Sequence, residues 1–408
     1  MRPDIAILSP LARNAGPAHG GITPVIIALA TGLCARGARV ELLTLSDDDP
    51  RRRWPQLPPD LSLYPLGRGR RWQQARRLRD YLAQRAPRAL LAAGHRANLL
   101  AARQAGGDSR VLLSIHNALT PGLGRLNPLR RWGRLWALKR WYPDADAIIC
   151  VSRGVAADFA SLVPKARDRI HSRYNPIASA ETEPEAPLHP WLNDTATPVI
   201  LGVGRLTTQK GFATLIRAFA QLEQQQPPRL LILGEGPERA ALQALAARLG
   251  VAERVALPGF VPNPRAQMAA ARVFVLSSVW EGFGNVLVEA MSVGTPVVAT
   301  DCPSGPREIL ADGRYGPLVA VGDVPALAAA IQQQLIAPTP SPLLRSRAAD
   351  FSPERVAARY LELLLPDWSP PAGAAPESAS ASASASALPR SRLNLDFTAC
   401  ADKAKDAR

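Results

Sequence analysis

The segment from Ser277 to Asp301 contains two carboxylates and a glycine-rich turn whose types and spacing suit a hydroxyl-rich or phosphorylated ligand. The turn Gly282–Gly284 lets backbone N–H groups approach a ligand closely, and a helix that starts near Asn285 adds unpaired donors and a positive dipole end. Glu281 precedes this helix and Glu289 lies about one turn inside it, so both can accept hydrogen bonds from sugar or ribose hydroxyls. On spacing alone, it is simpler to interpret Glu281 and Glu289 as ordinary helix-capping and surface residues.

Two cations earlier in the chain suit the stabilisation of a leaving phosphate. Arg205 follows an apolar run at 199–203, and Lys210 stands at the expected start of the next helix. Two positive charges that converge there would stabilise a departing diphosphate. From the residues alone, two solvated surface cations are the alternative.

Three smaller features follow expected strands in the same way. Gly234 and Gly236 form a turn after residues 230–233, Gly20-Gly21 precedes a helix, and His116 comes just after an apolar run at 111–115. The Gly234–Gly236 turn is equally typical of a plain connection between a strand and a helix. A lone histidine is usually structural, so His116 is either a structural residue or one that contacts the ligand.

The segment 277–301 resembles the signature of the retaining GT-B glycosyltransferases of family 4, which is Glu-x7-Glu with Gly-Phe-Gly inside and Gly-x-Pro-Val-Val-Ala-Thr-Asp behind. The agreement continues through Cys302–Leu310, a form found in the branch that builds lipopolysaccharide, capsule and lipid-linked oligosaccharides. Residues 202–211 are similar to the donor-phosphate motif of this family, and residues 174–176 to its interdomain hinge. The resemblance covers residues 5–365 and is strongest over 199–323.

This resemblance implies roles for individual residues. Arg205 and Lys210 would neutralise diphosphate charge without a divalent metal, and Glu281 would hold sugar hydroxyls. Glu289 would hold the ribose, and His116 would help to position the reacting sugar. The implied catalytic positions are Arg205, Lys210, Glu281 and His116, and the implied donor-binding positions are Gly20, Gly21, Gly204, Gly234, Gly236, Phe283, Gly284, Asn285 and Glu289. One departure concerns the acceptor side, because Gly20-Gly21 is followed by Ile22-Thr23-Pro24, where the family often has an acidic or polar residue and an arginine.

The elements that must position these residues alternate between apolar runs and helical periodicity, which indicates parallel sheets covered on both faces. Strands are expected at 5–8, 40–45, 89–92, 111–114, 147–150, 199–203, 230–233, 255–257, 273–276 and 296–299. Helices are expected at 211–226, 237–249, 285–293, 324–335 and 353–365, and an earlier one is expected to begin with Thr23 as N-cap and Pro24 as first residue. The fold class is therefore α/β, and the resemblance makes it GT-B, two Rossmann-like doubly wound domains that face each other across a cleft.

We expect an N-terminal acceptor domain at 1–175 and a proline-punctuated linker at 176–198. A donor-binding domain would follow at 199–345, and a helix at 346–365 would return to the first domain, as in the family. The Ser-Ala alternation and polar composition after Pro366 predict disorder for 366–408, with a tether for a partner as the alternative.

Composition narrows the class of protein. The chain has 408 residues, and 47% of them are apolar, which is typical of a globular protein. Its net charge of +15 indicates either an acidic partner or a general excess of arginine in the proteins of its source. We find no apolar run long enough to span a membrane and no secretory signal. The four cysteines are far apart and lack metal-site spacing, so a reducing, cytoplasmic location is the simpler expectation.

Two arginine clusters, at 68–88 and 125–142, carry much of the charge of the first half. Trp132 and Trp136, in the second cluster, would share a helical face. Cations and aromatic residues on one helix suit an anionic membrane surface, which would place the protein at the inner face of the cell membrane. The alternative is that the tryptophans pack into the core, and nucleic acid is disfavoured because no reading motif accompanies the clusters.

We therefore predict a retaining glycosyltransferase that moves a sugar from a nucleotide-sugar, by resemblance a UDP-sugar, to a lipid-linked or cell-surface glycan acceptor. No cofactor or metal is expected. Two alternatives stay open: a sugar-nucleotide epimerase of GT-B type, and a non-catalytic scaffold that binds sugar nucleotides.

Overall fold

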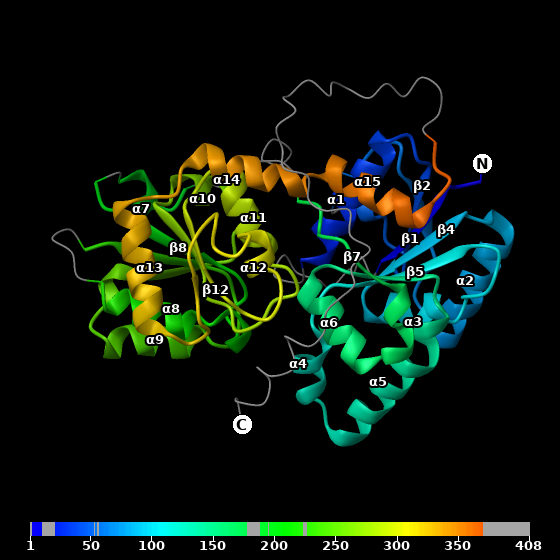
Figure 1. The fold of residues 1–408 in the computed structure, drawn as a ribbon, viewed down its shortest axis with the longest axis horizontal. Helices are drawn as coiled ribbons and strands as arrows, with labels where there is room; N and C mark the ends of the chain where they lie inside the picture. Colours follow the sequence, from blue (N-terminus) through cyan, green and yellow to red (C-terminus); the bar gives the residue numbers. More distant parts are fainter. Residues whose placement is uncertain are drawn as a thin grey trace. The chain divides into compact units, whose positions relative to one another are not determined.

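The described part of the chain forms two parallel sheets, each flanked by helices (Figure 1). The computed structural model describes residues 2–9, 21–52, 54, 57–177, 188–194, 196–222 and 227–369. The first sheet has seven strands in the order β3-β2-β1-β4-β5-β6-β7, and the second has six in the order β10-β9-β8-β11-β12-β13. Both sheets therefore wind outward in two directions from a central strand, which confirms the prediction of two Rossmann-like α/β domains.

The strands agree closely with the apolar runs of the sequence. Those of the first sheet are β1 (Ile5–Ser9), β2 (Val40–Thr44), β3 (Ser62–Pro65), β4 (Ala89–Ala93), β5 (Arg110–Ile115), β6 (Ala147–Cys150) and β7 (Ile170–Ser172). Those of the second are β8 (Val199–Val203), β9 (Arg229–Leu233), β10 (Val255–Gly259), β11 (Val273–Leu276), β12 (Val297–Thr300) and β13 (Leu318–Val319).

Burial on both faces explains why the central strands are apolar along their whole length. In β1, Ala6 and Leu8 belong to one hydrophobic core, whereas Ile5 and Ile7 belong to another on the opposite face. Successive side chains of a strand point to opposite faces, so helices that cover both sides of the sheet favour apolar residues at successive positions of its central strands.

The helices follow the strands along the chain. They are α1 (Ile22–Ala35), α2 (Arg71–Arg85), α3 (His95–Ala102), α4 (Leu119–Gly124), α5 (Pro128–Trp141), α6 (Arg153–Leu162), α7 (Pro190–Asn193), α8 (Phe212–Ala220), α9 (Arg239–Arg248), α10 (Arg265–Ala270), α11 (Asn285–Ser292), α12 (Pro306–Ile309), α13 (Val324–Ile336), α14 (Ser341–Ala348) and α15 (Pro353–Leu364). None of the helices within the described ranges is long and apolar enough to cross a membrane.

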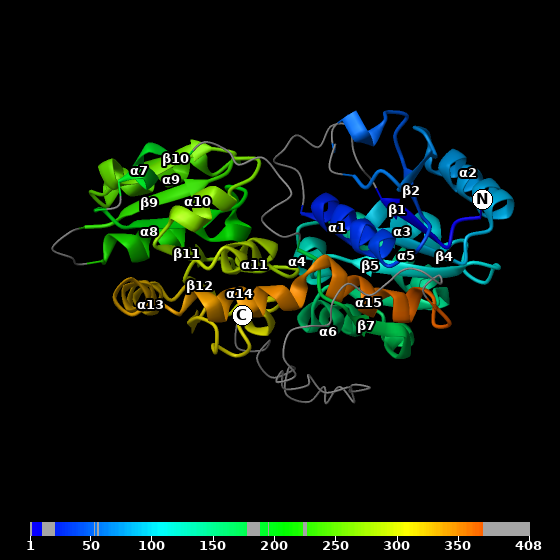
Figure 2. The same cartoon turned by 90° about the horizontal axis from the view of Figure 1, so that it is seen from above.

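The last helix packs on the first domain. Figures 1 and 2 both show α15 beside α1, and its residues Val356, Tyr360 and Leu364 join the hydrophobic core that contains Ile5 and Ile7. The approach is close, because a Cβ atom on Gly32 of α1 would lie 2.4 Å from the carbonyl oxygen of Pro353.

The structure corrects the predicted start of the first helix. The N-cap of α1 is Gly21, and Thr23 is a buried residue inside the first turn, so its hydroxyl does not cap the helix. Pro24 fits this later position because none of the first N–H groups of a helix has an intrahelical acceptor.

Other differences concern element ends and sheet edges. Helix α8 ends at Ala220, before the predicted 226, and α9 covers less than the predicted 237–249. Strands β3, β7 and β13 were not predicted, and no range was predicted for helices α2, α3, α4, α6, α7, α10, α12 and α14. The three strands are short and lie at sheet edges, where nearly all of their residues are half-buried or exposed, so the sequence carries little apolar signal for them.

The predicted domain boundaries stay a prediction. Within the predicted linker, α7 leads to Asp194, whose carboxylate lies 3.2 Å from the guanidinium of Arg229 in β9. Helix α14 spans the boundary that we placed after residue 345. Residues 178–187 and 195 of the linker, and 370–408 of the tail, lie outside the described residues.

Candidate active site

A cavity of about 360 Å³ lies where strands of both sheets end. His116 and Asn117 follow β5 of the first sheet, whereas Arg205, Gly234 and Glu281 follow β8, β9 and β11 of the second. Ligands of doubly wound sheets bind beyond the carboxyl ends of the strands, so the topology makes this cavity the candidate site.

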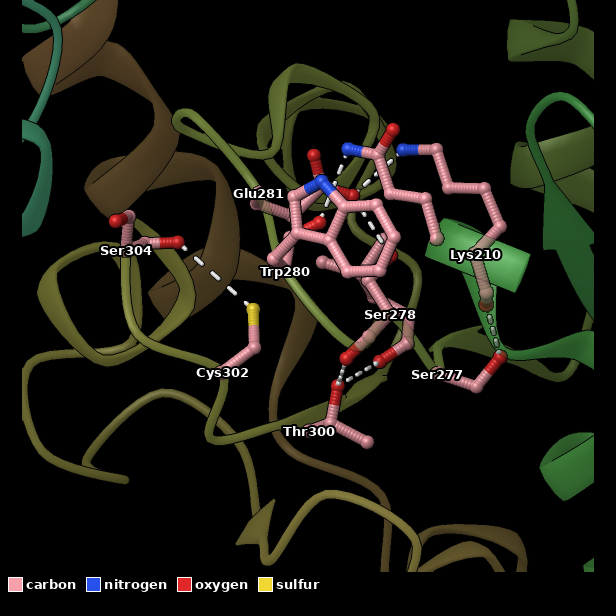
Figure 3. Close-up of polar contacts among 10 residues, drawn as sticks. Lys210, Ser277, Ser278, Trp280, Glu281, Thr300, Cys302 and Ser304 are labelled. Atoms are coloured by element: carbon pink, nitrogen blue, oxygen red, sulfur yellow. Dashed lines mark hydrogen bonds and ion pairs between the residues drawn. The ribbon is translucent and has the colours of Figure 1, made fainter. Parts of the chain in front are cut away.

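An ion pair between Lys210 and Glu281 stands at the centre of this site (Figure 3). The Nζ atom of Lys210 lies 2.6 Å from Oε1 of Glu281, and the two side chains are only 15% and 8% exposed. The hydroxyl of Ser278 donates a second hydrogen bond of 2.7 Å to the same oxygen. A carboxylate held by two donors presents its remaining lone pairs in a fixed direction, which suits the recognition of a hydroxyl group.

The backbone around this ion pair is held by hydrogen bonds between two loops (Figure 3). The hydroxyl of Ser277 donates to the carbonyl of Lys210 at 2.9 Å. The side-chain amide of Gln209 donates to the carbonyl of Trp280 at 3.0 Å. The hydroxyl of Thr300 donates to the carbonyl of Ser278 at 2.5 Å. The loop after β8 and the loop after β11 therefore form one hydrogen-bonded unit that holds Lys210 and Glu281 in place.

The start of α11 adds backbone donors to the cavity. Gly284 is its N-cap with φ of 100°, a left-handed conformation that favours glycine, and Gly284, Asn285 and Val286 all line the cavity. The amide of Asn285 donates to the carbonyl of Gly21 at 3.3 Å and accepts from the amide of Asn175 at 2.9 Å. Residues of the first domain and of the hinge thereby meet the helix end that is suited to an anion.

His116 enters the cavity from the first domain. Its Nε2 atom lies 3.0 Å from the hydroxyl oxygen of Ser114, and burial lowers the pKa of the imidazole to about 4, so the ring is neutral at pH 7. A Cβ atom on Gly282 would lie 1.9 Å from the carbonyl oxygen of His116. Only glycine at position 282 allows this approach between the loop that carries Glu281 and the loop that carries His116.

Other contacts join the same two loops and their neighbours. The hydroxyl of Ser152 donates to the carbonyl of Gly282 at 2.7 Å. The carboxylate of Glu308 accepts hydrogen bonds from the N–H groups of Arg153 and Gly154, at 2.8 and 3.2 Å, and so occupies the N-terminus of α6. A carboxylate is favourable there because a helix begins with unpaired N–H groups and a positive dipole end.

The structure brings most of the predicted site residues together. Those that line the cavity are Gly21, His116, Gly204, Arg205, Lys210, Gly234, Glu281, Phe283, Gly284, Asn285 and Glu289. Gly236 is not one of the residues that line the cavity. It packs against backbone, since a Cβ atom there would lie 2.3 Å from the carbonyl oxygen of Leu206. Gly20 lies outside the described residues.

The ring of Phe283 belongs to an aromatic cluster with Tyr174 and Phe351. It is stacked on Tyr174 at 5.3 Å between centroids and meets Phe351 at 5.5 Å, edge to face. Tyr174 and Phe351 stand on the two stretches of chain that connect the domains. The ring of Phe283 therefore ties the glycine-rich turn to these connections, and its backbone is the part suited to contact a ligand.

The predicted site residues did not include four polar residues that line the cavity, namely Asn117, Asn175, Gln209 and Glu235. Each is adjacent in sequence to a residue that we had singled out, so adjacency was a usable signal. Arg125 also crosses to the second domain, where its guanidinium lies 4.5 Å from the ring centroid of Trp280 and donates to the hydroxyl of Thr208 at 3.1 Å.

Two tryptophans of the basic helix α5 do not pack into the core. Trp132 and Trp136 are 66% and 50% exposed, which contradicts the alternative that both are buried. Trp141 does pack against the core, with the guanidinium of Arg103 at 4.1 Å from its ring centroid.

The two basic clusters meet around His95 of α3. Burial, with Arg134 of α5 and Arg71 of α2 nearby, lowers the pKa of His95 to about 4. Trp72, next to Arg71, is 60% exposed. Arg71 of α2 and Arg134 of α5 therefore both lie near His95.

Within the described ranges, no group of three or more His, Cys, Asp or Glu side chains is arranged to hold a metal ion. Among the residues that line the cavity, the cations are Arg205 and Lys210, and the start of α11 adds backbone donors. An anionic ligand would meet these groups directly.

Comparison with known proteins gives two family matches. The family described as Glycosyltransferase Family 4 matches residues 19–181, and the one described as Glycosyl transferases group 1 matches residues 197–336. The two matches together contain both sheets apart from the first strand.

Two curated relatives and one solved structure illustrate the similarity. The lipopolysaccharide core biosynthesis glycosyltransferase LpsE of Rhizobium meliloti is 35% identical over 55% of this chain and 65% of its own length. The N-acetylgalactosamine-N,N'-diacetylbacillosaminyl-diphospho-undecaprenol 4-alpha-N-acetylgalactosaminyltransferase of Campylobacter jejuni is 36% identical over 54% of this chain and 59% of its own length. The sucrose-phosphate synthase of Thermosynechococcus elongatus has a TM-score of 0.71 and 25% identity, with 89% of this chain and 98% of that one covered.

Proposed function

This chain belongs to the glycosyltransferases of family 4, and from that premise we propose that it transfers a sugar from a nucleotide-sugar to a glycan acceptor. The observation that carries the proposal is the ion pair of Lys210 and Glu281 within the cavity, at 2.6 Å. It places a cation for phosphate beside a carboxylate for sugar hydroxyls. The donor is a nucleoside diphosphate sugar, UDP-linked by family resemblance, and the anomeric configuration is retained.

The cations at the cavity stabilise the charge that develops during sugar transfer. As the bond between the anomeric carbon and the phosphate oxygen breaks, the electron pair stays on that oxygen and negative charge grows on the diphosphate. Lys210, Arg205 and the N-terminus of α11 line the same cavity and stabilise this charge without a metal ion. Because the loops around Lys210 are hydrogen-bonded beforehand, little reorganisation is needed during the reaction.

The remaining residues hold the donor. Glu281 accepts hydrogen bonds from sugar hydroxyls, together with the backbone of Phe283 and Gly284, and Glu289 accepts from the ribose. His116, neutral at pH 7, contacts the reacting sugar from the side of the first domain. Expulsion of water from the cavity limits hydrolysis of the donor.

The acceptor is a lipid-linked or cell-surface glycan, and the exposed face of α5 is the surface that approaches the membrane. Leu129, Trp132 and Trp136 are 78%, 66% and 50% exposed, and Arg130 and Arg131 are exposed beside them. Tryptophans and arginines on one helix partition into the headgroup region of anionic lipid. The protein would then work at the inner face of the cell membrane. The two relatives named above, one of lipopolysaccharide core biosynthesis and one named for a diphospho-undecaprenol glycan, support this choice of acceptor.

The test is release of UDP that depends on an added acceptor. Candidate UDP-sugars are first ranked by thermal shift, and each stabilising donor is then incubated with and without extracted lipid-linked glycans and lipopolysaccharide cores. Acceptor-dependent release is expected. Tight binding of a UDP-sugar without turnover across the acceptor panel would favour a non-catalytic scaffold. We do not propose the sugar-nucleotide epimerase, because both curated relatives are named as transferases.

A further inference from the structure

One arginine of the first domain contacts both loops that carry the central ion pair. Arg125 stands in the short connection between α4 and α5, and its side chain reaches the second domain. Its guanidinium lies 4.5 Å from the ring centroid of Trp280 and donates a hydrogen bond of 3.1 Å to the hydroxyl of Thr208. Trp280 directly precedes Glu281. Thr208 lies two residues before Lys210, so this one side chain bridges the two loops at the site.

The backbone from which Arg125 extends is held on both sides. On one side, the side chain of Asn127 accepts a hydrogen bond of 2.9 Å from the N–H of Arg130 and so caps α5. On the other side, the carboxylate of Asp158 in α6 accepts a hydrogen bond of 2.5 Å from the N–H of Leu119 in α4. Because this backbone is already ordered, contacts of Arg125 with the second domain cost little backbone entropy.

The surface that receives Arg125 is also ordered by hydrogen bonds. The side-chain amide of Gln209 donates to the carbonyl of Trp280 at 3.0 Å, and the N–H of Val279 donates to the carbonyl of Gln209 at 2.7 Å. A guanidinium is planar, so it can lie over an indole ring and donate hydrogen bonds from its edge at the same time. A shift of one loop relative to the other would therefore break one of the two contacts of Arg125.

Exposure to solvent separates this contact from others between the two domains. The hydroxyl of Ser152, a residue that is 0% exposed, donates to the carbonyl of Gly282 at 2.7 Å. Close by, a Cβ atom on Gly154 would lie 2.2 Å from the carbonyl oxygen of Pro303. Loss of such a buried contact leaves polar groups without partners, which is costly. Arg125 is exposed, so water can replace its hydrogen bond, and its contact is the easier one to break and to form again.

We propose that Arg125 is a positioning residue, because it holds the loop of Lys210 and the loop of Glu281 in one arrangement against the first domain. The contact forms when the two domains approach each other, and the loops then present the cation and the carboxylate together. That this arrangement serves sugar transfer rests on the proposed function, whereas the bridge between the loops does not. Lys210 and Glu281 contact the ligand, and Arg125 acts through them.

The bridge can be tested without any substrate by fluorine NMR of the full chain labelled with fluorinated tryptophan. The Trp280→Phe variant assigns the signal of Trp280. We expect Arg125→Ala to shift this signal, because it removes the guanidinium that lies over the ring. Since Arg125 is exposed, the loss of its side chain should leave the fold intact.

The matched control is Arg103→Ala. Arg103 is also exposed, and its guanidinium lies 4.1 Å from the ring centroid of Trp141 within the first domain. This variant should shift the signal of Trp141 and leave that of Trp280 unchanged. An unshifted Trp280 signal in Arg125→Ala, or an equal shift of it in Arg103→Ala, would overturn the bridge.

Turnover with the UDP-sugar that stabilises the protein most shows what the bridge does. Arg125→Ala should lower kcat about fivefold to tenfold and leave the affinity for free UDP within about twofold, because the groups that meet the diphosphate stay in place. Thr208→Val keeps the shape of the side chain, removes one of the two contacts and should lower kcat about threefold. It should have no further effect in the Arg125→Ala background, and losses that add up in the double variant would overturn the role of Arg125.

The two readouts separate this inference from the proposed function. A shifted Trp280 signal in a chain that shows no transfer would leave the bridge intact and reject the transferase. A shifted signal together with an unchanged kcat of Arg125→Ala would reject the positioning role in an active transferase.

Discussion

The cations at the cavity and the cations on α5 differ in what surrounds them. Lys210 is 15% exposed, is paired with Glu281 at 2.6 Å and stands on a loop held by hydrogen bonds to its neighbours. On α5, Arg130 and Arg131 are exposed, and so are Trp132 and Trp136 beside them. The cavity around Lys210 is suited to a small ligand of fixed shape, whereas the exposed face of α5 is suited to a fluid, anionic surface.

This difference has energetic consequences. A cation in a partly dry, ordered site acts strongly on charge that develops within a few ångströms, because few water molecules compete. Exposed cations act weakly one by one and are screened by salt, so their contribution comes from number and from the apolar surface beside them. Single substitutions should therefore have large effects in the cavity and modest effects on α5.

The largest effect is expected for Lys210→Ala. Removal of a preorganised charge donor should lower turnover by about 100-fold or more. The measurement is acceptor-dependent UDP release, with Arg217→Ala as control, because Arg217 is an exposed cation on α8 that does not line the cavity. Near-normal activity of Lys210→Ala would remove the basis for its phosphate role.

Glu281→Gln should separate recognition of the sugar from recognition of the nucleotide. The neutral amide keeps the shape but loses the charge-assisted hydrogen bonds, so kcat/KM for the UDP-sugar should fall by about 10- to 100-fold. Calorimetry should show an affinity for free UDP that changes by less than about threefold, since Lys210 stays in place.

The matched control for this change is Glu253→Gln, which alters an exposed glutamate of the same domain. A loss of UDP affinity that exceeds the loss of sugar turnover in Glu281→Gln would show that Glu281 acts on the nucleotide, contrary to our assignment.

On α5, the double variant Trp132→Ala/Trp136→Ala should bind vesicles of mixed neutral and anionic lipid about tenfold more weakly while its melting temperature is unchanged. Both side chains are exposed, so the core loses little. Ile336→Ala is the control, because Ile336 is 73% exposed on α13 of the other domain. Unchanged co-sedimentation of the double variant would exclude α5 as the membrane surface.

The smallest effect concerns pH. Burial lowers the pKa of His116 from 6.5 to about 4, so between these values the unfolded chain binds this proton and the folded chain does not. The contribution of the neutral His116 side chain to the free energy of unfolding is therefore complete above pH 6.5 and is lost as the pH falls toward 4. The difference in unfolding free energy between the unmodified chain and His116→Gln should change by at most about 1.4 kcal/mol per pH unit in this window.

His95 has a similarly lowered pKa but is present in both proteins, so its contribution cancels in this difference. Denaturant unfolding at several pH values gives the measurement. A difference that is constant from pH 6.5 to 4.5 would show that His116 titrates normally in the folded state.

Much of the fold was predictable because its signals are local. Apolar runs such as 199–203 and 273–276 became β8 and β11, and Ser352 caps α15 with Pro353 as its first residue, as expected. The edge strand β7 was missed because its three residues are only half-buried. The start of α1 was misplaced because Thr23 has the type of a capping residue, but its side chain is buried.

The sequence by itself determined which residues carry the chemistry and in which order the strands and helices follow, because side-chain type, backbone hydrogen bonding and hydrophobic periodicity act over a few residues. Only the tertiary structure decided that Lys210 pairs with Glu281, that Gly236 packs against the backbone of Leu206 and that Trp132 faces solvent. These contacts join segments far apart in the chain, and the packing of helices on two sheets, which no local spacing encodes, brings them together.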